Sequence, residues 1–493
     1  MTQSYPSRRG IALGISASLA LASSARGDSI WPVWADELRT SLERMADELY
    51  AVLKPWHGPK LLLTPEDFGY SGGKATEAIQ AAIDEAARRG GGTVRLSHGD
   101  YVSGTIDLRS RVRLDIAKGA RLLASLDLDD FPDRVAKRPT VMDSNMGMNQ
   151  SLIFAEGCTD IALSGEGTID GRGASFHGDE TIHGTPGRPF LIRVIDCTRV
   201  HVSGLRMLDS PCWMQNYLNC DDLLVEGLHV ENQANFNNDG LDIDGCRRVI
   251  VRHCYISSGD DSICFKGASE RPTEQVLIEH CTLYSSCNAL KLGTDSQSAF
   301  RNVLARHLEI GGVSDKMRHI KPVGADSGIS WEMVDGGTAE NILASDIHIV
   351  RARSPLFLRL DDRGRVRPEA PKPGVGTLRR IVFERITGKD NGPRGSYFVG
   401  IPAKAIEDVA LRDIRLDSLP AVKPVLNEAD IPEFYGVYPD AHMLDTLGDA
   451  PAYGLWTRHV TGLTLVTVKV VPTGADARPM LRVTADTKGV RIA

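Results

Sequence analysis

The stretch VIVRHCYISSGDDSICFKGASERPTEQVLIEHCTLYSSCNALKLGT, residues 249–294, contains one pattern twice. In each copy, a run of alternating apolar residues is followed by a polar pair and a second alternating run. The copies are VIVRHCYI from Val249 and VLIEHCTL from Val276, 27 residues later. Alternation with a period of two is typical of a strand, because successive side chains point to opposite faces. A strand unit that recurs at this spacing indicates one coil of a solenoid.

The same unit recurs on both sides of this stretch, and the four copies from Val200 onward start 23, 26 and 27 residues apart. A helical solenoid would need stripes with a period of 3.6, and a propeller blade would need several paired hairpins. We therefore predict an all-β fold, a right-handed, single-stranded parallel β-helix. The further copies are VHVSGLRM from Val200, LLVEGLHV from Leu223, VLARHLEI from Val303, ILASDIHI from Ile342, IVFERITG from Ile381 and VALRDIRL from Val409.

Two helices are expected before the repeats. Residues 74–89 (KATEAIQAAIDEAARR) form an amphipathic pattern that three glycines end. A helix there can cover the first coil, whose exposed strand edge would otherwise pair with other chains. Residues 31–53 predict another helix outside the solenoid. We expect a helical extension over residues 26–60 and one β-helix catalytic domain over residues 61–493.

The first 25 residues resemble an export signal. Arg8 and Arg9 precede an apolar run over residues 10–22, and small residues follow at 23–25. The paired arginines favour a twin-arginine signal over a general secretory one. The apolar run is too short to span a membrane as a helix. We expect a periplasmic or secreted protein without a membrane anchor.

Composition narrows the function classes. The net charge is −7 with mixed signs, so no basic footprint for nucleic acid is visible. Several of the nine cysteines recur at one position of the repeat, for example Cys220 and Cys246 in successive coils. This placement predicts stacked thiols inside the solenoid rather than disulfides. The sequence contains no Cys and His spacing of the kind that binds zinc. Separately, we expect the protein to be a monomer.

Three neighbouring coils end in polar segments: NNDGLDIDG at 237–245, SGDDSICFKG at 258–267 and SCNALKLGT at 286–294. Aligning their apolar strand residues places Asp239, Asp261 and Asn288 at one position of successive coils. Strands of a sheet lie about 4.8 Å apart, so these side chains should form a ladder on one face. Asp260 precedes Asp261, and a bend there would turn both side chains outward.

Clustered carboxyl groups have a chemical use. Neighbouring negative charges raise the pKa of one member, which leaves a protonated acid beside ionised carboxylates. Glycoside hydrolysis needs this combination, because one group protonates the leaving oxygen while another activates water. The alternatives are aspartates that only stabilise turns and a calcium site. The presence of three acids, Asp239, Asp260 and Asp261, on adjacent coils favours catalysis.

These residues resemble those of glycoside hydrolase family 28, the polygalacturonases and rhamnogalacturonases. The family's Asn-Thr-Asp motif corresponds to Asn237-Asn238-Asp239, and its paired aspartates correspond to Asp260-Asp261. The resemblance implies inverting hydrolysis of a pectic polysaccharide or oligosaccharide without a metal or cofactor. It also implies that Asp260 is the general acid, that Asp239 and Asp261 activate water, and that Asn237 helps to orient the substrate or an acid.

Two departures from the family concern substrate recognition. The family's Gly-His-Gly is replaced by Cys287-Asn288-Ala289, so Asn288 stands where the histidine would be. The strand GISWEM at 328–333 places Ser330 and Glu332 where an Arg-Ile-Lys motif binds the galacturonate carboxylate. We expect Glu332 to repel galacturonate, and Lys291 or Lys266 to compensate. The sequence therefore favours a rhamnogalacturonan-like substrate, or an exo-acting enzyme, over plain polygalacturonate.

Two aromatic residues could contact the substrate, and two other functions are possible on this fold. Trp213 and Tyr217 lie one coil before Asp239, where aromatic rings could stack on sugars, although core packing or a turn is an equal alternative for each. A polysaccharide lyase on the same fold would need calcium and a basic residue. A carbohydrate-binding protein without catalysis is the second rival, and the retained acids argue against it.

Overall fold

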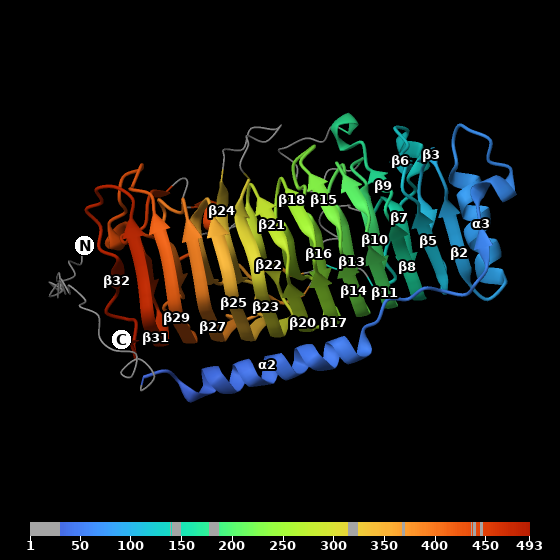
Figure 1. Ribbon diagram of the computed structural model, residues 1–493. Coiled ribbons are helices and arrows are strands. Elements are labelled where there is room, and N and C mark those ends of the chain that lie inside the picture. The colour runs from blue at the N-terminus through green and yellow to red at the C-terminus, as the bar shows by residue number, and fades with distance from the viewer. Residues whose placement is uncertain are drawn as a thin grey trace.

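A long stack of parallel coils makes up the molecule (Figure 1). The computed structural model describes residues 30–138, 140, 149–176, 187–313, 324–366, 370–434, 436, 440–443 and 447–493. All pairings between the named strands within these residues are parallel, and the fold is the predicted right-handed β-helix. The predicted export signal, residues 1–25, lies outside the described residues.

One face of every coil belongs to a 12-stranded sheet. Its strands follow one another in chain order along the solenoid. They are β4 (Ile106–Asp107), β7 (Ser151–Glu156), β10 (Phe190–Ile195), β13 (Gln215–Leu218), β16 (Leu241–Asp244), β19 (Ile263–Gly267), β22 (Asn288–Ser296), β24 (Ala325–Met333), β26 (Ala352–Leu360), β28 (Ser396–Val399), β30 (Leu455–Arg458) and β32 (Leu481–Val483).

The other faces form a 21-stranded sheet. Early coils contribute two short strands to it, and later coils contribute one long strand. They are β1 (Leu62–Leu63), β2 (Gly92–Leu96), β3 (Gly99–Ser103), β5 (Val112–Ile116), β6 (Ala120–Ala124), β8 (Thr159–Gly165), β9 (Thr168–Asp170), β11 (Thr198–Ser203), β12 (Arg206–Leu208), β14 (Asp221–Glu226), β15 (His229–Asn232), β17 (Arg247–Arg252), β18 (Tyr255–Ser258), β20 (Thr273–Glu279), β21 (Thr282–Ser285), β23 (Ala299–Gly312), β25 (Thr338–Val350), β27 (Thr377–Lys389), β29 (Ile406–Ser418), β31 (Val460–Pro472) and β33 (Arg491–Ile492).

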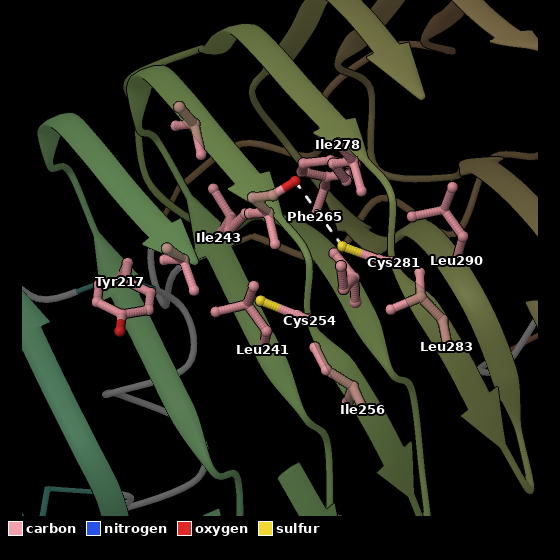
Figure 2. Packing of buried hydrophobic residues seen from close by; sticks show 14 of the residues in the cluster. Tyr217, Leu241, Ile243, Cys254, Ile256, Phe265, Ile278, Cys281, Leu283 and Leu290 are labelled. Carbon is pink, nitrogen blue, oxygen red and sulfur yellow. Dashed lines mark hydrogen bonds between the residues drawn. The ribbon is translucent and has the colours of Figure 1, made fainter. Parts of the chain in front are cut away.

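The core consists of apolar residues stacked in register. Leu241 of β16 pairs with Ile263 of β19, which pairs with Leu290 of β22, and all three are buried. Cys254 and Cys281 point into the same interior (Figure 2). All nine cysteines are free, which confirms the prediction of unpaired thiols.

The predicted capping helix is α3 (Thr76–Arg88), at the N-terminal end of the solenoid (Figure 1). Its buried face joins the apolar core through Ile79, Ala82, Ile83 and Ala86. The helix therefore covers the first coil, as the sequence predicted. Short 3-10 helices lie at η1 (Pro65–Phe68), η2 (Leu128–Asp130), η3 (Gly173–Ser175), η4 (Glu428–Asp430) and η5 (Ala441–Met443).

The second predicted helix, α2 (Val33–Val52), lies along the outside of the solenoid (Figure 1). Its apolar face packs on one outward position of seven successive coils, from Leu224 in β14 to Ala410 in β29. A helix of 20 residues is about 30 Å long, and seven strands at about 4.8 Å spacing cover about 29 Å. The length of the helix thus matches the length of the row of seven coils that it covers. None of the helices in the described ranges combines the length and apolar character of a membrane span.

Truncating the buried face of α2 should loosen the helix from the solenoid. Leu42 is almost fully buried against the seven-coil row. We expect Leu42→Ala to lower the free energy of unfolding by about 2–4 kcal/mol and to make α2 sensitive to protease. Thermal unfolding and limited proteolysis measure both effects. Glu43→Ala, at an exposed position of the same helix, is the control, and equal protease resistance of the two variants would contradict this packing.

Candidate active site

The three polar segments meet on the outer face of the 12-stranded sheet. The register of β16, β19 and β22 brings Asp239, Asp261 and Asn288 to one position of successive coils. The Asn288 side chain donates a hydrogen bond to Asp261 Oδ1 at 2.8 Å, and the Gly240 amide donates to the Asp261 carbonyl at 2.8 Å. The ladder predicted from the alignment is therefore present, and we call these three residues the acid ladder.

Asp261 is surrounded by donors that stabilise a negative charge. The Lys291 ammonium lies 3.2 Å from Asp261 Oδ2, and that of Lys266 lies 3.8 Å away. Asn288 supplies the amide donor, and Ser327 fixes the orientation of that amide by donating to Asn288 Oδ1 at 2.6 Å. Charge-assisted contacts of this kind are shorter and stronger than hydrogen bonds between neutral groups. Asp261 is thus suited to act as a base.

Asp239 lies among other acids around Lys266. The Lys266 ammonium is 3.3 Å from Asp239 Oδ2 and 3.5 Å from Asp242 Oδ1. Burial, and next the negative charge of Asp242, raise the pKa of Asp239 well above its ordinary value. Burial also raises the pKa of Asp242 to about 7. Ionisation of Asp239 therefore depends on its neighbours.

Asp242, which the sequence-based prediction did not include, also belongs to this group of acids. It lies between Leu241 and Ile243, both of which point into the core. In a strand, the residue between two inward positions points outward. The alternation in NNDGLDIDG was the signal that would have placed Asp242 beside the acid ladder.

Asp260 differs from the other acids in its exposure. It is only partly buried, whereas Asp239, Asp242 and Asp261 are buried. The bend that carries it is held by two hydroxyl groups, because Ser258 Oγ and Ser285 Oγ donate to the Asp260 carbonyl at 2.6 and 2.5 Å. A group that protonates a bound sugar must reach the substrate, and Asp260 has the best access among these acids.

Glu332 does not have the predicted effect on galacturonate. Lys291 pairs with Ser330 in the next coil, as expected, but the Glu332 side chain is fully buried. Burial raises the pKa of Glu332 to about 8, so this carboxyl group is protonated at neutral pH. The expected repulsion by Glu332 was wrong, because an uncharged and covered group presents no negative charge to the cleft.

Neither lysine offers a readily available charge for a substrate. Lys266 and Lys291 are 7% and 5% exposed. Lys266 is enclosed by three aspartates, and Lys291 lies near Asp261, Asp440 at 3.4 Å and Glu332 at 4.0 Å. Their charges therefore mainly balance carboxylates of the protein itself.

Of the remaining predicted residues, Tyr217 was placed wrongly. It pairs with Ile243 at an inward position, is fully buried in the core (Figure 2), and donates to Gln215 Oε1 at 3.0 Å. It cannot stack on a sugar. Trp213 lies at the site, with the Lys266 ammonium 4.7 Å from its ring centroid, but it is only 5% exposed. Asn237 Oδ1 accepts a hydrogen bond from Arg188 at 3.0 Å, a partner that the sequence did not indicate.

One group in the described ranges has the spacing of a metal site. Ligand atoms of Asp260, Asp261 and Cys287 lie within 4.8 Å of one another. Calcium prefers six to eight oxygen ligands, and two carboxylates with a thiol match that preference poorly. The calcium alternative therefore receives little support from the geometry.

Residues 136–428 match the profile described as "Glycosyl hydrolases family 28". The chain belongs to this family. The match includes the whole acid ladder with Asp260 and Lys291, and it ends before Asp440.

Individual relatives cover only part of the chain. "Probable polygalacturonase" of Vitis vinifera is 29% identical over 47% of this chain and 51% of its own length. "Exopolygalacturonase X-1" of Emericella nidulans is 25% identical over 56% of this chain and 64% of its own length. The chain thus spans between about half and two thirds of the length of these relatives.

A solved structure shares the fold. The hyperthermoactive exopolygalacturonase from Thermotoga maritima superposes with a TM-score of 0.65 over 88% of this chain and 96% of its own. Its sequence identity to this chain is 17%. This likeness confirms the β-helix and carries no further conclusion about the site.

Removing the charge of Asp242 should change the pH dependence of the site. A neutral residue in its place no longer raises the pKa of Asp239, so Asp239 should ionise at lower pH. We expect Asp242→Asn to move the acidic limb of the kcat/KM profile down by about one pH unit. The control is Asp244→Asn, at the next outward position of β16, and an equal shift in both variants would contradict the specific role of Asp242.

Proposed function

We propose that the protein is an inverting glycoside hydrolase that cleaves α-glycosidic bonds in pectin-like polysaccharides or oligosaccharides. The observation that carries this proposal is the difference between two adjacent acids: Asp261 of the acid ladder is buried and contacts the Lys291 ammonium, while its neighbour Asp260 is more exposed. Membership of glycosyl hydrolase family 28 supports the reaction class. The names of the relatives, polygalacturonase and exopolygalacturonase, support a pectic substrate.

Different environments support different roles for the acids. Asp260 donates a proton to the leaving oxygen, since it has the greatest access to a bound sugar. Asp261 withdraws a proton from the attacking water, because Lys291 and Asn288 stabilise its negative charge. Asp239 assists in its ionised form, which Lys266 favours and which burial and Asp242 oppose, so its contribution grows as the pH rises. Water supplies a hydroxyl group to the anomeric carbon, and Asp261 takes up the remaining proton of that water. The leaving sugar receives the proton of Asp260.

The proposal also covers the location of the protein, its oligomeric state and its preferred substrate. The pair Arg8-Arg9 before the apolar run supports export through a twin-arginine signal to the periplasm or beyond. We propose a monomer without a membrane anchor. Because Ser330 and Glu332 replace the basic pair of the family motif, a rhamnogalacturonan-like substrate or exo action is favoured over plain polygalacturonate.

Product release on a pectic panel tests the proposed reaction. The purified protein and Asp260→Asn are compared on polygalacturonate, rhamnogalacturonan and their short oligomers, with a chelator present. We expect saturated products, and a loss in kcat of about 10²–10⁴-fold in the variant because the general acid is removed. Reducing ends and absorbance of unsaturated products are measured.

The matched control is Asp346→Asn, a substitution in β25 of the 21-stranded sheet that removes one partner of an exposed pair with Arg385. It should keep full activity. Unsaturated products that require calcium would identify a lyase instead. Binding without turnover in the unaltered protein would identify a carbohydrate-binding protein.

A further inference from the structure

One asparagine on the outer face of the 12-stranded sheet is almost buried and yet unbonded. Asn216 lies in β13 next to Tyr217, which points into the core (Figure 2). Successive strand residues point to opposite faces, so Asn216 points outward. It is only 8% exposed. Throughout the ranges that the structure describes, its side-chain amide group has no hydrogen-bond partner.

An unbonded amide in such a place opposes folding, because it loses contact with water and gains no protein partner in return. Two other buried asparagines are bonded through both amide atoms. Asn232 donates to the Asp239 carbonyl at 2.8 Å and accepts from the Ser210 amide at 2.9 Å. Asn391 donates to the Ile349 carbonyl at 3.0 Å and accepts from the Ala352 amide at 3.0 Å. The different state of Asn216 indicates a group that is kept for a ligand.

The register places Asn216 one coil away from the reacting groups. It pairs with Asp242 of β16, and Asp242 Oδ1 lies 3.5 Å from the Lys266 ammonium. The same ammonium lies 3.8 Å from Asp261 Oδ2. Since adjacent strands are about 4.8 Å apart, a sugar chain that reaches Asp261 and continues toward the N-terminal coils passes over Asn216.

Trp213 forms the other side of this position. It lies in the turn before β13 and packs edge to face on Phe190, with ring centroids 5.4 Å apart. The Lys266 ammonium lies 4.7 Å from its ring centroid. These contacts hold the indole in place. A fixed aromatic ring beside a polar group that donates and accepts hydrogen bonds is a typical composition for a binding position.

The chemistry of the position favours hydroxyl groups over a carboxylate. Asn216 pairs with Arg193 in the preceding coil and with Asp242 in the following one, so opposite charges flank it. The amide itself is neutral and offers two donors and one acceptor. Neighbouring hydroxyl groups of a sugar ring match that combination, because each of them donates and accepts.

We propose that Asn216 binds hydroxyl groups of the sugar unit that lies one coil to the N-terminal side of the acid ladder. The inference rests on the proposed function for the substrate class, and it adds how this unit is recognised. Asn216 is a substrate-binding residue that selects units with free hydroxyl groups, whether their carboxyl groups are charged or esterified.

Stability and kinetics together separate a binding role from a structural one. Asn216→Leu removes hydrogen bonding at similar size, so we expect a Tm at least as high as that of the unaltered protein. The value of kcat/KM on pectic oligomers should fall about tenfold. Asn216→Ala gives the same comparison with a smaller side chain. The matched control, Asn391→Leu, should lower the Tm and change kcat/KM by less than about twofold.

Binding to an inactive protein tests the recognised group. Asp260→Asn and Asp260→Asn/Asn216→Leu are titrated by calorimetry with galacturonate oligomers, their methyl esters and their O-acetylated forms. We expect the double variant to bind the acidic oligomers and the methyl esters about tenfold more weakly. The O-acetylated oligomers should bind equally to both proteins, because their hydroxyl groups are blocked.

Several results would overturn the role of Asn216. They are equal affinity of the two proteins for all oligomers, a weakening confined to the acidic oligomers, an equal weakening for the O-acetylated ones, and no binding by Asp260→Asn at all. An active enzyme with any of these results leaves the proposed reaction intact. The expected binding pattern in a protein without turnover refutes the reaction and keeps the sugar position.

Discussion

Every feature of this molecule depends on the in-register hydrogen bonding of parallel coils. Strands at a spacing of about 4.8 Å place equivalent residues of successive coils in direct contact. Inward positions such as Leu241, Ile263 and Leu290 thereby form a continuous core. Outward positions obey the same register, so Asp239, Asp261 and Asn288 meet although 49 residues of sequence separate the first from the last. One geometric rule thus produces both the continuous apolar core and the cluster of acids on the outer face.

The same register brings carboxyl groups of adjacent coils together, and two lysines reduce the repulsion between them. Carboxyl groups in adjacent coils are close enough to repel one another, and most of them are buried. Lys266 lies between Asp239, Asp242 and Asp261, and Lys291 lies between Asp261 and Asp440. Each ammonium group stabilises charges that burial would otherwise neutralise. The remaining imbalance keeps protons on selected groups, which is the condition for acid and base to coexist.

The repeats made the fold and the acid ladder predictable, because the alternation of apolar residues reports both the strand and its register. Where the prediction failed, the reason is local. Tyr217 was assigned to the cleft because of its chemistry, but the pairing with Ile243 turns it inward. Glu332 was correctly placed on its strand, yet its burial and protonation depend on Lys291 and the packing above it. Asp440 lies outside any repeat, and no periodic signal indicates where such a segment folds back.

The helix α2 has a consequence for the order in which the chain folds. It leaves the ribosome before any coil, but its docking row is complete only after β29 has formed. Arg39 of α2 donates to Glu384 at 2.9 Å across 345 residues of sequence. Contacts of such large sequence separation form late, because their loop-closure entropy is offset only when the intervening structure exists. During synthesis the apolar row from Leu224 to Ala410 is therefore exposed to water, and the nascent solenoid is open to aggregation. Docking of α2 ends that vulnerable period, so a helix at the start of the sequence takes part in one of the last steps of folding.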